Sequence, residues 1–322
     1  MSPTLFSPYQ NKTNFFLHTM KASTILKSYL LRSRSPASVA PLPEKSQFDQ
    51  ELTTELDTLG GDVGLAQLLD ASITTQKVVL NSLVNVSYSN DSDRGDVDKY
   101  LEDNVEILDV CNYFVEKIES INNYVDTLKM VVHLVDNGSA KLNKVATIRA
   151  MELLESSCKS VENRSCKGLK NLLRQRLCHH ETNISEIMCG SKAVTLMCLR
   201  FLEHGLSFDS KSGMLPTMKL SQPTSSSWLR LLNELAKQAE ASVDEKKLQK
   251  RRSSLLQQTI DTARELRQQM KGGKEMQSCV DRLKRNCKEL EDEIEDIEGK
   301  VKDLYRCLIN VRMTLLGILS QA

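Results

Sequence analysis

The C-terminal part of the chain carries a long apolar repeat. Between Met276 and Ile318, apolar residues alternate in steps of four and three without interruption, which is the heptad spacing of a helix face that packs on other helices. At 1.5 Å rise per residue, this segment predicts one helix about 65 Å long. The repeat consists of Met276, Val280, Leu283, Cys287, Leu290, Ile294, Ile297, Val301, Leu304, Leu308, Val311, Leu315 and Ile318.

This repeat also decides how the acidic run from Glu289 to Glu298 should be interpreted. The run holds seven acidic residues but keeps apolar residues at the heptad positions, whereas an acidic tail would show no periodicity. We therefore expect the acids on the solvated face of a packed helix. Burial of the seam against helices of the same chain is the favoured interpretation, and coiled-coil pairing with a second copy is the alternative.

Composition agrees with a helical protein that is not a general nucleic-acid binder. The chain has 322 residues, of which 26% are charged and 40% hydrophobic, and its net charge is +1. This balance does not provide the broad basic surface that nucleic acid or acidic lipid requires. None of the nine cysteines forms the C-x-x-C pattern of a zinc or redox site, so we expect small buried thiols in a reducing compartment.

The first 43 residues differ from the rest of the chain. They contain no Asp or Glu and are rich in serine and threonine, and their basic residues include Lys12, Lys21, Lys27, Arg32 and Arg34. This composition is typical of an organelle transit peptide. A disordered tail in which Ser35, before Pro36, is a candidate phosphorylation site is the alternative. Chloroplast and cytoplasm therefore both remain open as the location.

Helical spacing predicts the rest of the fold. Residues 44–206 are expected to form the N-terminal half of a helical bundle, with helices over 65–83, 101–135, 142–161, 169–177 and 184–202. Residues 207–227 lose the periodicity and read as a flexible linker or loop. Residues 228–322 are expected to form a long hairpin, in which one continuous helix runs from Trp228 to the Gly272-Gly273 turn. The predicted fold class is an all-α, elongated antiparallel helical bundle with long coiled-coil-like helices.

No stretch of the sequence carries the residue pattern of a known reaction. The tetrapeptide at 178–181, CHHE, offers metal-binding atoms, but successive helical side chains point about 100° apart and do not close on one ion. Signatures of nucleotide binding and of nucleophilic catalysis are missing. We therefore expect no catalytic, cofactor-binding or metal-binding residues. Residues 187–206 are the most apolar window, but four charged or titratable residues interrupt it, so a buried bundle helix is expected rather than a membrane span.

A basic segment provides the clearest candidate contact. The stretch KKLQKRR contains Lys246, Lys247, Lys250, Arg251 and Arg252 without an acid. It could contact a partner protein or lipid head groups or act as a nuclear signal, but pairing with the acidic residues of 289–298 is the favoured interpretation. Ser254 follows the two arginines and is a candidate site for a basophilic kinase.

Two motifs resemble a known plant family. The stretch YLEDNVEILDVCN, from Tyr100 to Asn112, resembles the signature of the plant BYPASS family, with its Leu-Asp-hydrophobic-Cys-Asn core. The stretch VKDLYRCLINVRMTLLGIL, from Val301 to Leu319, is similar to the closing helix of that family, where Arg312 and the Thr-Leu-Leu group match. The resemblance covers most of the chain from about residue 44.

The resemblance implies a role in plant growth without a known catalytic activity. It implies a developmental regulator or adaptor in root and shoot development that restrains a root-derived mobile growth-arrest signal. One alternative is a small-molecule binder or enzyme in the synthesis or turnover of that signal, with a pocket lined by residues such as Cys111, His133 and Cys198. Another is a helical adaptor for exocyst-type vesicle tethering, peripheral on an endomembrane.

We expect particular kinds of partner from these interpretations. They are a protein partner bound through helical surfaces, no nucleic acid, at most peripheral membrane contact, and a homo-oligomer as a further option.

Overall fold

The described part of the chain is a helical bundle. The computed structural model describes residues 46–59, 64–85, 91–136, 144–160, 166–177, 182–208, 218–220, 226–244, 254–272 and 276–321, all within one compact unit, Lys45–Ala322. The expectations for residues 1–43 lie outside the described residues. The helices are α1 Gln47–Asp57, α2 Leu65–Val84, α3 Asp91–Asp136, α4 Lys144–Ser160, α5 Lys167–Arg174, α6 Asn183–Gly205, α7 Ser227–Asp244, α8 Leu255–Gly272 and α9 Gln277–Gln321.

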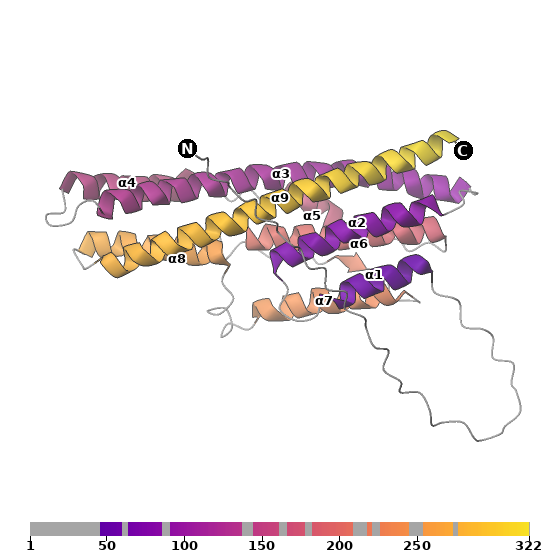
Figure 1. Ribbon diagram of the computed structural model, residues 1–322, viewed down its shortest axis with the longest axis horizontal. Helices are drawn as coiled ribbons and strands as arrows, with labels where there is room; N and C mark the ends of the chain where they lie inside the picture. The colour runs from indigo at the N-terminus through magenta and orange to yellow at the C-terminus, as the bar shows by residue number, and fades with distance from the viewer. Residues whose placement is uncertain are drawn as a thin grey trace, which may run out of the picture. The chain divides into compact units, whose positions relative to one another are not determined.

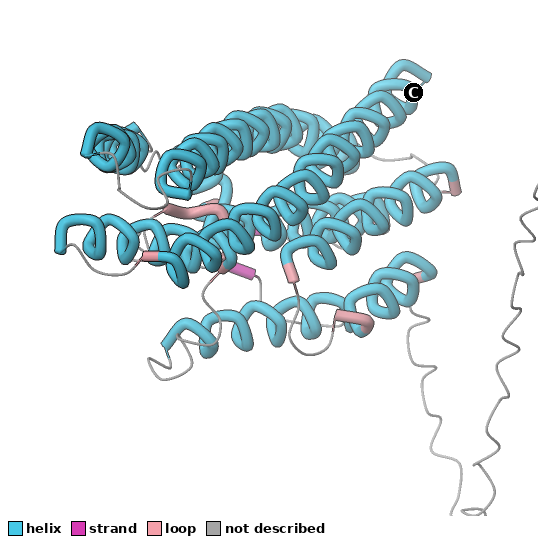
Figure 2. The backbone as a smooth tube through the Cα atoms, turned by 60° about the vertical axis from the view of Figure 1, so that its left-hand side comes forward, coloured by secondary structure: helices cyan, strands magenta, loops and turns pink. Residues whose placement is uncertain are grey.

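The predicted all-α class is confirmed. Helices account for most of the tube in Figure 2. Within the described residues, the strands are β1 Arg176–Leu177 and β2 Lys219–Leu220, two residues each, and they pair in parallel. Figure 1 shows α3 and α9 side by side over much of their length, with α2 and α6 next to them and α1 next to α7. The domain boundaries expected at residues 206 and 228 stay predictions.

The heptad seam is buried within the chain, as predicted. The seam residues from Val280 to Leu315 are at most about 3% exposed and pack in one core with α2, α3 and α8, whereas Met276 and Ile318 at the two ends are half-buried. Most of the acids between Glu289 and Glu298 are exposed, and Glu298 itself is half-buried. The spacing of apolar and acidic residues therefore predicted correctly which face of α9 is buried and which is exposed.

Contacts between side chains fix the direction of the neighbouring helices. Along α3 from Leu101 to Asp136, the partners on α9 run backwards from Arg312 to Lys284, so α3 and α9 are antiparallel. Helix α6 instead runs parallel to α3, because Tyr100 contacts Ser191 near the start of both helices and Tyr124 meets the ring of Phe208 edge to face beyond the end of α6. Helices α4 and α5 lie between them in sequence and return the chain to the start of α3.

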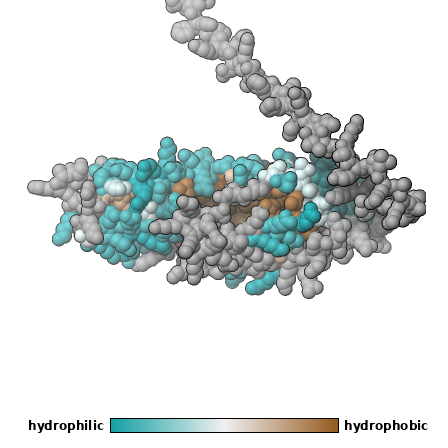
Figure 3. Space-filling model, turned by 90° about the horizontal axis from the view of Figure 1, so that it is seen from below, coloured by the Kyte–Doolittle hydropathy of each residue, from teal (hydrophilic) through white to brown (hydrophobic). Residues whose placement is uncertain are grey.

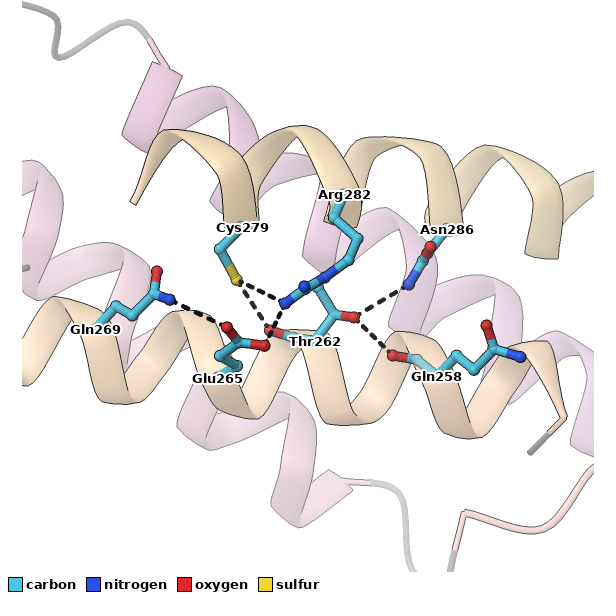
Figure 4. Close-up of polar contacts among 7 residues, drawn as sticks. All are labelled: Gln258, Thr262, Glu265, Gln269, Cys279, Arg282 and Asn286. Atoms are coloured by element: carbon cyan, nitrogen blue, oxygen red, sulfur yellow. Dashed lines mark hydrogen bonds and ion pairs between the residues drawn. The ribbon is translucent and has the colours of Figure 1, made fainter. Parts of the chain in front are cut away.

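Helices α8 and α9 form the predicted hairpin. In Figure 4, Asn286 of α9 donates to the hydroxyl of Thr262 on α8 at 3.1 Å, and Arg282 forms an ion pair with Glu265 one turn further on. The thiol of Cys279 donates to the backbone oxygen of Thr262 at 3.6 Å. These contacts are polar and lie beside the apolar seam, so they set the register of the hairpin.

The expected continuous helix from Trp228 to Gly272 is wrong. The structure has two helices there, since α7 ends at Asp244 and α8 begins at Leu255. Between Ala236 and Leu255 the only large apolar residues are Val243 and Leu248, which is too few to keep one helix face in a core. The two helices also pack separately, α7 on α1 and α6, and α8 on α4 and α9.

The apolar window at 187–206 forms most of α6, which is a buried bundle helix as expected. Both aliphatic residues and charged residues such as Lys192 and Glu203 are less than 9% exposed there. None of the described helices is long and apolar enough to cross a membrane. Among the coloured residues of the face shown in Figure 3, most are hydrophilic, and hydrophobic ones show toward the middle.

Candidate interaction surface

The sequence-predicted contact residues fall mainly outside the described part of the chain. The five basic residues between Lys246 and Arg252 lie there, as does Ser35, so their roles stay predictions. Ser254 is described: its hydroxyl accepts a hydrogen bond from the backbone N–H of Gln257 at 3.2 Å and caps the first turn of α8. Among the acids of α9, Glu291 pairs with Lys129 of α3 at 2.5 Å.

The residues suggested for an internal ligand pocket do not come together. Cys111 and Cys198 are neighbours and are almost fully buried, whereas His133 is exposed. His133 lies 22 residues further along α3, which is about 33 Å at 1.5 Å per residue. Burial raises the pKa of the Cys111 thiol to about 12 and also raises that of Cys198. Both thiols are therefore protonated and poor nucleophiles near neutral pH.

A buried hydrogen-bond network joins α2, α3 and α6, and sequence reasoning missed it. The amide of Gln76 donates to Thr195 at 3.0 Å and accepts from Ser191 at 2.7 Å, while the hydroxyl of Tyr100 is 2.8 Å from that of Ser191. All four residues are at most 4% exposed. Burial raises the pKa of Tyr100 to about 12. These hydrogen bonds form only when the three helices are aligned in one way along their axes, so the network fixes their register.

One buried and one partly buried ion pair account for two charged residues of α6. Lys192 lies 2.5 Å from Asp103 of α3, and Glu203 lies 2.9 Å from Lys117, which is also on α3. Tyr113 also donates to Glu203 at 3.4 Å. The opposite charges of each pair neutralise each other within the bundle. In the described ranges, no group of three or more His, Cys, Asp or Glu residues is placed to hold a metal ion.

An outward-facing surface between α3 and α9 combines apolar and acidic side chains. Met313 is 61% exposed, Val105 43% and Leu316 39%. The guanidinium of Arg312 donates to the backbone oxygen of Leu101 at 2.6 Å, which brings these helical turns together. Val105 follows Leu101 by one turn, and Leu316 follows Arg312 by one turn. Because α3 and α9 are antiparallel, these two steps run in opposite directions, so Val105 and Leu316 lie about two turns apart along the helix pair, on either side of the contact between Arg312 and Leu101.

Four acids on α3 accompany these apolar residues. Asp98, Glu102, Glu106 and Asp109 are exposed, and no ion pair joins them to another residue of the described part. Their spacing of three to four residues places them along one side of the helix. We call the set the α3–α9 surface; it comprises Asp98, Glu102, Val105, Glu106, Asp109, Met313 and Leu316.

Several signals in the sequence point to this surface. The four acids and Val105 fall within or just before the YLEDNVEILDVCN motif, and Met313 and Leu316 lie in the closing-helix motif. Neither motif by itself shows that the two segments meet. Their proximity comes from the antiparallel pairing of α3 and α9.

Comparison with known proteins agrees with the resemblance. The family model described as Protein BPS1 matches residues 64–318, which include the first motif, the second motif up to Ile318, and the buried network. No curated protein and no solved structure matches the chain at a significant level. Since the family match covers well over half of the sequence, the chain belongs to the BPS1 (BYPASS1) family, and this membership supports a plant developmental regulator of the BYPASS type.

Proposed function

We propose that this protein is a non-enzymatic helical adaptor that acts in root and shoot development and restrains a root-derived mobile growth-arrest signal by binding a partner protein. The observation that carries the proposal is the α3–α9 surface, where Met313 and Leu316 are exposed and four acids form no ion pair with another described residue. Exposed apolar side chains next to charged residues are typical of a protein-binding site.

The chemistry of the surface suggests the class of partner. An amphipathic helix docks by placing apolar residues, spaced by three and four, on an apolar surface. Basic residues on the flanks of that helix would pair with Glu102 and Glu106, which have no such partner in the described part. We therefore expect a basic amphipathic helix of another protein. An exocyst-type tethering partner would fit the same description.

Two further features support an adaptor rather than an enzyme. The thiols of Cys111 and Cys198 are buried with raised pKa values, and the buried polar side chains of Gln76, Tyr100 and Ser191 already bond one another. As to compartment, the acid-free first 43 residues support import into the chloroplast, and the cytoplasm is the alternative.

The test compares partner binding by variants of the tagged full-length chain. In Met313→Ser/Leu316→Ser the surface loses two apolar residues. Burying their exposed fractions, 61% and 39%, contributes about 1.5 to 3 kcal/mol for the pair, so binding is expected to weaken by about tenfold or more. In Glu102→Gln/Glu106→Gln the acids become neutral, which should slow association and reduce its dependence on salt. Native mass spectrometry of protein purified from tissue reports whether a partner mass is retained.

Matched controls carry the same chemical changes elsewhere. Met130→Ser removes a methionine from α3 that is 52% exposed, compared with 61% for Met313, and Glu289→Gln/Glu295→Gln neutralises exposed acids of α9. Both controls should retain the partner. In plants that lack the gene, these controls should restore shoot growth and the Met313→Ser/Leu316→Ser variant should not. Retention of the partner and full rescue by that variant would refute the proposal.

A further inference from the structure

A small pocket lies away from the α3–α9 surface, where the last turn of α2 meets the first turns of α1 and α6. Its volume is about 210 Å³. The polar residues that line it include Glu51 of α1, Asn81, Ser82 and Asn85 of α2, and Asn183 and Glu186 of α6. Pockets for drug-sized ligands are about 300 to 1,000 Å³, so this one suits a smaller molecule.

The charged side chains around the pocket are all of one sign. Glu51 and Glu186 are the charged residues among the described residues that line it. The C-terminus of α2, which has no basic residue in its last turn, adds partial negative charge, and the N-termini of α1 and α6 add partial positive charge. The two full carboxylate charges outweigh the positive contribution. The pocket therefore attracts cations and repels anions.

Glu186 is held in place by hydroxyl groups from two other segments. One carboxylate oxygen accepts a hydrogen bond from Ser46 and the other from Ser226, each at 3.1 Å. Ser46 also caps α1 by accepting from the N–H of Asp49 at 3.0 Å. A charge fixed in this way by the fold loses little freedom when it binds a ligand, so the site is preorganised.

The remaining polar groups of the pocket are available as hydrogen-bond acceptors. Glu51 accepts from Gln47 at 2.7 Å through one oxygen, and among the described residues no hydrogen bond engages its other oxygen. The side-chain amides of Asn81 and Asn183 likewise bond to no described residue. Carboxylate and amide oxygens at one site suit a ligand with several N–H donors.

We propose that this pocket binds a small organic ammonium compound, with the ammonium group between Glu51 and Glu186 and its remaining N–H donors on the asparagine side chains. An anion would face two carboxylates, and a neutral apolar molecule would desolvate them without compensation. This inference is independent of the adaptor role, since neither the pocket nor its lining overlaps the α3–α9 surface.

The test uses three probes with the same carbon chain and different charge. Butylammonium, butan-1-ol and butanoate are titrated into the full-length protein and followed by saturation-transfer NMR and calorimetry. Butylammonium alone should bind, and added salt should weaken it. The proposal is overturned if butan-1-ol binds equally well. It is also overturned if butylammonium does not bind at about 10 mM, a concentration at which even a weak site with Kd near 1 mM would be nearly full.

Two variants and one control locate the binding. Glu51→Gln should weaken butylammonium about five- to tenfold through loss of a charge-assisted hydrogen bond, and Asn81→Leu should weaken it by occupying the pocket. Asp57→Asn neutralises an exposed acid of the same helix outside the pocket and should change the affinity less than about twofold. Equal losses in Glu51→Gln and Asp57→Asn would show a general surface effect and refute the site.

Discussion

Replacing Lys192 by methionine is expected to destabilise the protein by about 3 to 5 kcal/mol, the cost of leaving a buried charge without its partner. Lys192 is 6% exposed and Asp103 5%, and the ammonium lies 2.5 Å from the carboxylate and 2.9 Å from the side-chain oxygen of Gln175. Methionine fills a similar volume, so little cavity cost is added. Lys99, 3.8 Å from Asp103 and largely exposed, should offset part of the loss and favour the lower end of that range.

The double variant separates loss of charge balance from loss of packing. Lys192→Met combined with Asp103→Leu removes both charges and should recover most of the lost stability, because a buried pair replaced by apolar residues is often neutral. The matched control is Lys129→Met, which breaks a half-exposed pair with Glu291 and should cost less than about 1 kcal/mol.

The free energy of unfolding is measured by urea denaturation, followed by far-ultraviolet circular dichroism. A loss below about 1 kcal/mol in Lys192→Met would show that water reaches the pair. A double variant whose loss equals the sum of the two single losses would show that the two charges do not interact.

Two other predictions concern close packing and thiol burial. Gly190→Ala should destabilise the protein by about 1 to 3 kcal/mol, because a Cβ there would lie 2.7 Å from the ring of Phe48 on α1. Gly299→Ala, where a Cβ would have no atom within 4 Å, should instead stabilise α9 by up to about 1 kcal/mol. Thermal unfolding of both variants checks these values, and equal shifts of the same sign would contradict the prediction. Burial raises the pKa values of Cys111 and Cys287 to about 12, so at pH 8 both should react with a thiol reagent no faster than the protein unfolds. Peptide mapping by mass spectrometry measures the reaction rates. Rapid labelling of either cysteine in folded protein would contradict this prediction.

The elements of the fold could largely be predicted because apolar spacing is a local signal. Helices α2, α3, α4 and α6 agree with the expected ranges within a few residues except at the start of α3, which begins ten residues before Leu101. The stretch around Gly95 looked like a turn from its Asp, Asn and Gly content, but Val97 and Tyr100 are buried there, and that packing stabilises the helix. Tertiary contacts thus overrode a local propensity.

The candidate sites were harder to predict because their residues come from distant segments. The basic residues from Lys246 to Arg252 were conspicuous because they are adjacent in sequence. The α3–α9 surface joins Val105 to Leu316, and the pocket joins Glu51 to Glu186, with more than a hundred residues between each pair. A single sequence reports charge and exposure along one helix, and it does not report which two helices meet.

The sequence by itself determined that this protein is helical and that α9 buries one face. The reason is physical: an uninterrupted repeat of apolar residues from Val280 to Leu315 is stable only as a helix with that face removed from water. Any apolar surface can cover such a seam, so the repeat does not specify its neighbour. Only the tertiary structure decided that α3 runs against α9 and beside α6, because the contacts that choose among these arrangements, such as Gln76 with Ser191 and Lys192 with Asp103, are polar, buried and specific in geometry.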